Sequence, residues 1–142
     1  MDNVKNAVGS CLCQSVKVKV EEMSLQVGAC HCSMCRKWSG APALSVDCYS
    51  HVTFEGESHI SVFNSSEWAE RGFCSQCGTH LFYRLKAKNQ YIMSVGLFGS
   101  HPSFEFDHQI FIDDKPSYYR FANATKNMTG EEVFAAYASD NT

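Results

Sequence analysis

The sequence predicts a mainly β protein whose strands surround metal sites, with one short helix after a cysteine triple and another near the C-terminus. Three observations support this fold class. Short alternations of apolar and polar residues recur along the chain between glycine, asparagine and serine, which is typical of strands and turns. Seven of the eight cysteines stand in three tight clusters. Helical character is confined to residues 33–38 and 129–137.

Length and composition narrow the class of protein. A chain of 142 residues with 44% hydrophobic and 19% charged residues is expected to form a single domain, which we place at residues 1–142. The net charge of −3 and the lack of a lysine or arginine run argue against a nucleic-acid or membrane partner. Residues 1–5 lack an apolar targeting segment, and no stretch is long enough to span a bilayer, so a cytoplasmic location is expected.

The cysteines are predicted to bind metal. In a reducing compartment, cysteines spaced as Cys-x-Cys and Cys-x-x-Cys are typical of metal ligands rather than of disulfides. Partners this close in sequence also do not easily reach the Cα separation that a disulfide requires. Thiolates are preferred ligands of zinc, which they bind at about 2.3 Å in a tetrahedron.

The first cluster lies at the root of a predicted strand. Cys11 and Cys13 follow Gly9, and in extended backbone their side chains would point to opposite faces. The backbone must therefore turn there if both cysteines bind one metal. Residues 15–20 alternate strictly between polar and apolar side chains, which predicts a half-buried strand with its valines facing inward. Residues 21–28 are expected to form a turn and a short return strand.

The second cluster is the triple Cys30, Cys32 and Cys35. Three thiols this close in sequence can converge on one cation without long-range folding. Residues 33–38 are expected to form about two helical turns before Gly40, with Ser33 as the N-cap. The positive end of that helix would face the thiolates and lower their pKa values.

The middle of the chain is expected to consist of strands. These are predicted at residues 43–48, and at 52–56 and 59–63, which are joined by a turn around Gly56. Cys48 stands outside the clusters and is expected to be a small core residue. The third cluster, Cys74-x-x-Cys77 followed by Gly78, has the spacing of a zinc knuckle, in which glycine can adopt a positive φ.

Further strands and a helix are expected towards the C-terminus. Residues 81–84 and 91–95 are predicted to form strands on either side of a polar turn. Residues 109–112 and 118–121 are predicted to form two more around a turn at 113–116. Thr129 and Glu132 fit a capping box that begins a short helix.

Seven thiols divide into four and three, and spacing permits two partitions. One joins Cys11, Cys13, Cys74 and Cys77 in a closed structural site and leaves the triple open. The other joins Cys32 and Cys35 with Cys74 and Cys77 in a zinc ribbon. We favour the first partition, because the triple can bind as one compact unit and the four-ligand site would close a long loop.

The clustered residues resemble a known family. The resemblance rests on Gly9-Ser10-Cys11-x-Cys13, Cys30-His31-Cys32-Ser33-x-Cys35-Arg36-Lys37-x-x-Gly40, Ser65-Ser66, Arg71-x-Phe73-Cys74-x-x-Cys77-Gly78-Thr79 and His108-Gln109-Ile110-Phe111-Ile112 with Lys115. Together these motifs look like the glutathione-dependent formaldehyde-activating enzyme family over about residues 9–122. The sequence departs from the family at Gln14, where glycine is usual after the second cysteine.

The resemblance implies a fold, two zinc ions and an activity. It implies stacked antiparallel sheets of the Mss4-like kind and the first partition, with Cys11, Cys13, Cys74 and Cys77 on a structural zinc. Cys30, Cys32 and Cys35 would hold a catalytic and labile zinc. The implied activity is that of a carbon–sulfur lyase, which interconverts S-hydroxymethylglutathione with glutathione and formaldehyde.

An open zinc site with three thiolates suits chemistry on thiols. Three thiolates make zinc soft and a weak Lewis acid, so holding a fourth, incoming thiolate is a more natural task than activating water. The expected partner is therefore a small-molecule thiol such as glutathione. Arg36 and Lys37 are candidates to bind the carboxylates of such a substrate, although both are equally explained as solvated helix cations. No feature indicates the oligomeric state.

Two alternatives remain open from sequence. The chain could be a zinc-stabilised module that binds thiol adducts or a protein partner without turnover. His31 or His80 could also supply a fourth ligand and close the open site. We expect His31 to point away from the metal, because cysteine ligands flank it on both sides, and His80 to lie at the surface or beside the ligands. His101 and His108 have no informative spacing, and the sequence identifies no proton-transfer residue.

Overall fold

The computed structural model describes residues 3–140, which form two compact units, each built from two separate stretches of the chain. The first unit comprises residues up to 25 and 45–104, and the second comprises residues 26–44 and those from 105 onwards. Most of the regular structure is β-strand, as the sequence predicts. No helix in residues 3–140 is both long and apolar enough to cross a membrane.

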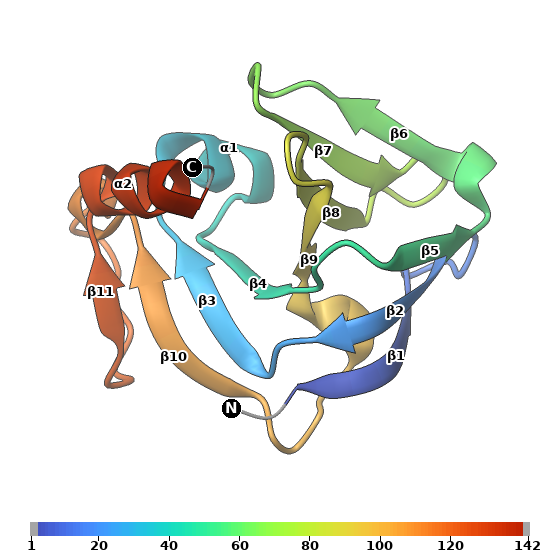
Figure 1. Cartoon of the computed structure of the whole chain (residues 1–142), viewed down its shortest axis with the longest axis horizontal. Helices are drawn as coiled ribbons and strands as arrows, with labels where there is room; N and C mark the ends of the chain where they lie inside the picture. Colours follow the sequence, from blue (N-terminus) through green and yellow to red (C-terminus); the bar gives the residue numbers. More distant parts are fainter. Residues whose placement is uncertain (1–2, 141–142) are drawn as a thin grey trace. The chain divides into compact units, whose positions relative to one another are not determined.

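The first unit contains two packed sheets. Its strands are β1 (Val4–Ser10), β2 (Lys17–Met23), β4 (Ala43–Asp47, from residue 45 on), β5 (Val52–Glu55), β6 (Ile60–Phe63), β7 (Ala69–Cys74), β8 (His80–Leu85) and β9 (Gln90–Ser94). One sheet has the strand order β1-β2-β5. In the other sheet, the strands of this unit have the order β4-β9-β8-β7-β6. Among the described residues, the strand pairs β1–β2, β2–β5, β4–β9, β6–β7, β7–β8 and β8–β9 are antiparallel (Figure 1).

Aromatic side chains join these two sheets. Phe54 of β5 lies with its ring centroid 5.6 Å from that of Phe82 of β8, which in turn lies 5.0 Å from the ring of Tyr91 of β9. The alternation expected for β2 is confirmed, because Val18 and Val20 are buried whereas the lysines between them are exposed. The apolar faces of both sheets therefore form a shared core.

The segment around Gly56 does not form a hairpin. β5 pairs with β2, whereas β6 pairs with β7 in the other sheet. A short 3₁₀ helix (η1, Glu57–His59) separates the two strands and carries the chain from one sheet to the other. A second 3₁₀ helix (η2, Val95–Phe98) follows β9.

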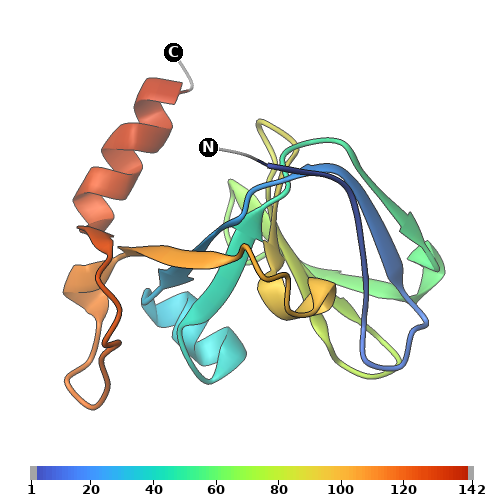
Figure 2. The same cartoon turned by 90° about the horizontal axis from the view of Figure 1, so that it is seen from below.

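The second unit is built on parallel strands. Its elements are β3 (Gln26–Cys30), α1 (Ser33–Ser39), β10 (Glu105–Ile110), η3 (Ile112–Asp114), β11 (Lys126–Met128) and α2 (Gly130–Asp140). β10 lies between β3 and β11 and is parallel to both (Figure 1). In Figure 2, α2 continues directly from the end of β11. The unit thus presents the C-terminal ends of β3 and β10 at one edge.

The prediction of a strand at residues 118–121 is wrong. In the structure, β10 is followed by η3 and then by irregular backbone. The strands that pair with β10 are β3 and β11. Lys115 Nζ donates to the carbonyls of Pro116 and Tyr119, so these residues form a closed loop rather than a hairpin. The Tyr119 hydroxyl lies 2.7 Å from His31 Nδ1.

Candidate metal centres

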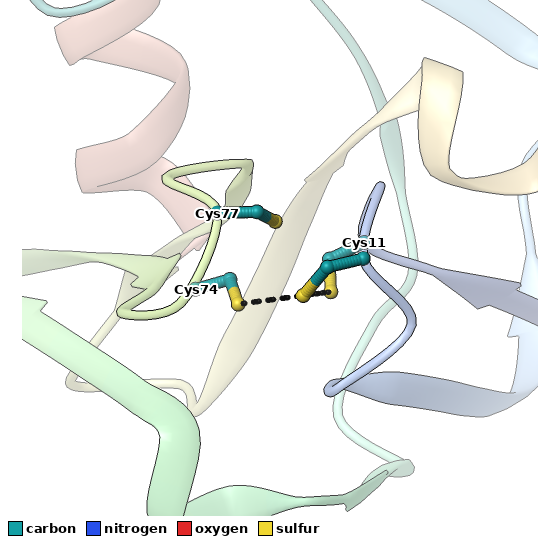
Figure 3. Close-up of side chains that lie close together, drawn as sticks. Cys11, Cys74 and Cys77 are labelled. Atoms are coloured by element: carbon teal, nitrogen blue, oxygen red, sulfur yellow. Dashed lines mark hydrogen bonds between the residues drawn. The ribbon is translucent and has the colours of Figure 1, made fainter.

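Four thiols of the first unit come together from two distant segments. The sulfur atoms of Cys11, Cys13, Cys74 and Cys77 all lie within 4.8 Å of one another. Figure 3 shows the side chains of Cys11, Cys74 and Cys77 pointing toward one another. Cys13 Sγ lies 3.8 Å from Cys74 Sγ, although the two residues are 61 positions apart in the sequence. We call these four residues the four-thiol group.

The turn between Cys11 and Cys13 has the form that two ligands on one metal require. Gln14 N donates to Cys11 O at 3.1 Å, and Gln14 has a φ of 66°, in the left-handed region that glycine favours. This explains why glycine suits the position. Leu12 N donates to Thr79 Oγ1 at 3.1 Å, so the turn is tied to the segment after Cys77.

The thiols of the four-thiol group differ in pKa because their surroundings differ. Hydrogen bonds with Thr79 lower the pKa of the Cys77 thiol to about 5, and hydrogen bonds with Ser15 lower that of Cys13. Burial raises the pKa of Cys74 to about 11. Two thiols thus favour the thiolate, while a buried one requires a nearby cation to ionise.

Three thiols of the second unit form another group. The sulfur atoms of Cys30, Cys32 and Cys35 lie within 4.8 Å of one another. Within residues 3–140, no fourth cysteine, histidine or carboxylate joins them at that separation. Cys30 ends β3, and Cys35 lies in the first turn of α1. We call these residues the triple.

The N-cap of α1 is Cys32 and not Ser33 as predicted. Cys32 has extended backbone, and its Sγ accepts a hydrogen bond from Cys35 N at 3.4 Å. The helix ends at Gly40, whose φ of 74° provides the left-handed C-cap. One sulfur thus serves both as a helix cap and as a member of the triple.

The triple needs a cation for its thiols to ionise together. Hydrogen bonding with Cys32 and Cys35, followed by burial, raises the pKa of the Cys30 thiol. Neighbouring thiolates repel one another, and a divalent cation removes that penalty. Both groups of thiols could therefore hold a soft divalent cation, for which sulfur is the preferred donor.

His31 points away from the sulfurs and is fully buried. Its Nε2 lies 2.7 Å from Gln109 Oε1, and its Nδ1 lies 2.7 Å from the hydroxyl of Tyr119. The His31 and Tyr119 rings also stack, with centroids 5.5 Å apart. Both ring nitrogens are engaged, so His31 is not available as a fourth ligand of the triple.

The amide of Gln109 has a fixed orientation. Gln109 Nε2 donates to Thr125 Oγ1 at 2.8 Å, and the Thr125 hydroxyl donates to Asn127 Oδ1 at 2.6 Å. Gln109 Oε1 must then accept, so His31 Nε2 carries a proton. Burial lowers the pKa of His31, which favours the neutral ring with Nδ1 as the acceptor of the Tyr119 hydroxyl proton.

Arg36 is fixed beside the triple, and Lys37 is exposed on α1. Arg36 Nε donates to the carbonyl of His31 at 2.8 Å. This bond holds the guanidinium against the loop that carries the triple. A role of either cation in substrate binding stays a prediction.

The remaining candidates belong to neither thiol group. His80 begins β8 and is half-buried, and burial and the charge of Arg71 lower its pKa. Cys48 is 1% exposed, and burial raises its pKa to about 12, as suits a core residue. The structure groups the thiols as in the first partition. Their role as metal ligands stays a prediction.

Sequence reasoning missed the residues that support the triple. Gln109 is 78 positions from His31, and Tyr119 is 88 positions away. No local spacing signals such contacts. One signal was available in the sequence. A histidine flanked by two cysteines is expected to be buried, and a buried ring nitrogen requires a hydrogen-bond partner.

The fold and the two thiol groups define a class: a β-rich protein with one four-thiol and one three-thiol centre able to hold metals. Comparison with known proteins gives the family. The model of the family described as "Glutathione-dependent formaldehyde-activating enzyme" matches residues 6–114, and the chain belongs to this family.

Two known proteins show how far the similarity extends. An uncharacterized lyase of Schizosaccharomyces pombe is 36% identical over 126 residues, which cover 88% of this chain and 92% of that protein. The crystal structure of a Rhodobacter sphaeroides protein superposes with a TM-score of 0.57 and 22% identity, covering 67% of this chain and 91% of that chain. The second likeness concerns the fold alone.

Proposed function

We propose that this protein is a zinc-dependent carbon–sulfur lyase that acts on glutathione, or a related thiol, and its aldehyde adduct. Membership of the family supports a glutathione-related role, and the name of the S. pombe relative supports a lyase. The observation that carries the proposal is the triple: three converging sulfurs with His31 turned away and bonded at both nitrogens.

The two thiol groups have different expected roles. Structural zinc sites are usually closed by four protein ligands, whereas catalytic sites supply three and leave one position for another ligand. We assign a structural zinc to the four-thiol group and a catalytic, labile zinc to the triple. When bound at the triple, zinc would supply a soft cation that favours the ionised form of a substrate thiol at neutral pH.

The protein side chains bind and orient the substrate. The reaction makes or breaks the bond between the sulfur of glutathione and the carbon of formaldehyde. Arg36 is held by its bond to His31 O, so the remaining amino groups of its guanidinium can meet a carboxylate of the substrate. Lys37, on the exposed surface of the same helix, is a second candidate for a carboxylate.

The test combines metal counting with a rate measurement. Native mass spectrometry of freshly purified protein should show two zinc ions, one of which responds to added glutathione. Exchange NMR with labelled formaldehyde should show faster formation and cleavage of S-hydroxymethylglutathione than without protein. Cys32→Ser should hold one zinc and lose the acceleration. Serine is a good N-cap, so this change keeps the α1 cap and removes the thiolate.

Cys48→Ala is the matched control, since Cys48 belongs to neither thiol group. This variant should behave as the unchanged protein does. An intact rate in Cys32→Ser would contradict the proposal. Two zinc ions that are indifferent to thiols, with no acceleration, would favour a zinc-stabilised binding module instead.

A further inference from the structure

Asp107 and His108 of β10 form a hydrogen-bonded pair that neither thiol group uses. His108 Nδ1 lies 2.7 Å from Asp107 Oδ1, and the other carboxylate oxygen accepts from Gln26 Nε2 at 2.7 Å. The register between β10 and β3 shifts between Phe106 and His108, so Asp107 occupies an irregular position in the ladder. Both oxygens of Asp107 are therefore engaged, and the carboxylate is fixed in place.

This arrangement determines which nitrogen of His108 can react. Because the Asp107 carboxylate accepts a hydrogen bond, Nδ1 of His108 carries the proton and Nε2 has the free lone pair. Among the described residues, Nε2 has no hydrogen-bond partner. The His108 side chain is 40% exposed. A carboxylate that orients one nitrogen and leaves the other open is the arrangement of a general base.

The open nitrogen lies against Gly28. A Cβ atom added at Gly28 would lie 2.1 Å from His108 Nε2, so the ring occupies the space above this residue. His108 is the register partner of Gly28, and Ile110 is the partner of Cys30. The absence of a side chain at Gly28 is what allows the ring to lie across β3.

The same face of β3 leads to the triple. Side chains alternate along a strand, so positions 28 and 30 share a face, about 6.6 Å apart along it. Gln109 projects to the opposite face, where it meets His31. His108 is thus on the face of β3 that carries Cys30, one same-face position before the triple.

We propose that His108 is a catalytic general acid–base for the thiol–aldehyde reaction at the triple, with Asp107 as its positioning residue. This inference rests on the proposed function. Cleavage of a hydroxymethyl thioether releases a proton from the hydroxyl group, and the sequence identified no residue to take it. His108 Nε2 lies on the correct face to accept that proton.

The proposed step balances without a further reactant. As the C–S bond breaks, its electron pair goes to sulfur and leaves as the thiolate of glutathione. The O–H electron pair forms the second C–O bond of formaldehyde, and the proton moves to His108 Nε2. The imidazolium is stabilised by the Asp107 carboxylate. In the reverse direction, Nε2 returns the proton to the aldehyde oxygen as the thiolate attacks carbon.

The test uses the full-length, zinc-loaded protein and the exchange of labelled formaldehyde with S-hydroxymethylglutathione. His108→Gln should lower the protein-dependent rate about 100-fold, because general acid–base catalysis typically contributes about 10²–10⁴-fold. The zinc count should not change. His101→Gln is the matched control, since His101 lies in an exposed loop where Nδ1 accepts from Ser103 N, and its rate should stay within twofold.

Chemical rescue separates proton transfer from a structural role. Added imidazole should restore part of the rate of His108→Ala and should not accelerate the unchanged protein. A rate for His108→Gln within twofold of that of the wild-type protein would overturn the proposal. So would a zinc-loaded His108→Ala variant that imidazole does not rescue.

If the histidine variants lose zinc, the Asp107→Asn variant tests the proposal instead. A rate at least 10-fold lower supports the proposal, and an unchanged rate overturns it. If the wild-type protein itself gives no acceleration, the proposed function is contradicted. This result differs from a failure of the His108 proposal alone, in which the wild-type protein accelerates the reaction.

Discussion

Both ring nitrogens of His31 have hydrogen-bond partners, and these bonds tie the loop of the triple to residues far along the chain. Its ring bonds to Gln109 and Tyr119, and its carbonyl accepts from Arg36. The flanking residues Cys30 and Cys32 therefore have little freedom to separate. Fixing ligands before a metal arrives reduces the entropy lost on binding.

We predict that Tyr119→Phe loosens the triple without unfolding the protein. The change keeps the aromatic stack and removes one hydrogen bond to His31, which costs about 0.5–1.5 kcal/mol of stability. The triple should release zinc to a chelator about 10-fold faster, while release from the four-thiol group stays unchanged. Tyr118→Phe, at the adjacent and 78% exposed tyrosine, should change neither rate. Equal acceleration at both groups would contradict this role.

A hydroxyl controls ionisation in the four-thiol group. Thr79 Oγ1 lies 3.1 Å from Cys77 Sγ and also accepts from Leu12 N. The hydrogen bonds from the Thr79 side chain and backbone stabilise the thiolate of Cys77, whose pKa is lowered to about 5. The same atom thus joins the two halves of the group and prepares one ligand for a cation.

We predict that Thr79→Val makes zinc leave this group at a higher pH. Without the hydroxyl, the pKa of Cys77 rises, so protons compete with the metal sooner as the pH falls. The midpoint of acid-induced zinc release should move upward by about 0.5–1 pH unit. A zinc-sensitive dye would follow the release. Thr79→Ser retains the hydroxyl, so its midpoint of zinc release should match that of the wild-type protein. A shift in Thr79→Ser as large as that in Thr79→Val would contradict this role of the hydroxyl.

At the scale of elements, α1 and α2 are each preceded by a residue whose side chain caps the first turn. In α1 the cap is a sulfur of the triple, so helix formation and grouping of the thiols depend on one residue, Cys32. In α2 the predicted capping box is present. Thr129 N donates to Glu132 Oε1 at 2.8 Å, and Glu132 N donates to Thr129 Oγ1 at 3.2 Å.

We predict that the start of α2 weakens at low pH. The hydrogen bond from Thr129 N lowers the pKa of Glu132, so the carboxylate stabilises the helix above its unfolded pKa of about 4.5. That contribution declines as the pH falls and is lost once it passes below the lowered folded pKa. The protection factors of the amides in the first turn of α2, which are corrected for the intrinsic pH dependence of exchange, should fall over this range. Glu132→Gln should abolish the pH dependence, whereas Glu131→Gln, in the same turn, should retain it.

A second change tests the cap from its other side. Thr129→Ala removes the hydroxyl that accepts from Glu132 N, which costs about 1 kcal/mol of local stability. The amides of α2 should exchange about fivefold faster at neutral pH, as that free energy implies. Unchanged exchange at the first turn would show that the helix is held by other contacts, such as that between the rings of Phe111 and Phe134.

At the scale of the whole molecule, each compact unit holds one thiol group and is built from two separate stretches of chain. The four-thiol group joins the segment after β1 to the turn after β7. It therefore closes a long loop, whereas the triple lies within a few consecutive residues. The expectation that residues 1–142 form one domain stays a prediction.

We predict that the two groups contribute unequally to stability. Metal bound by four thiolates across a long loop contributes folding free energy directly, of the order of 10 kcal/mol in small zinc domains. Cys74→Ser should lower the thermal midpoint by more than about 10 °C, and Cys32→Ser by only a few degrees. Scanning calorimetry with parallel metal counting would measure both. The opposite order would show that the triple is the structural centre.

Much of the fold could be predicted from sequence. The alternation of valines and lysines predicted β2 and its buried face, and the capping box predicted α2, because both signals are local. The hairpin of β8 and β9 was also predicted by its polar turn. The predicted strand at residues 118–121 was wrong, because pattern alone does not reveal that Tyr119 turns to His31. The parallel pairing of β10 with β3 and β11 has no local signal either.

The sequence by itself determined which residues carry the chemistry: the three cysteine clusters, together with the motifs that identify the family to which the chain belongs. Spacing is enough for this, because ligands within a few residues of one another need little folding to meet. The tertiary structure alone decided how the thiols group, that His31 faces Gln109 and Tyr119, and that His108 lies over Gly28. Those contacts join residues about 60 to 90 positions apart, and only the pairing and packing of strands brings such residues together.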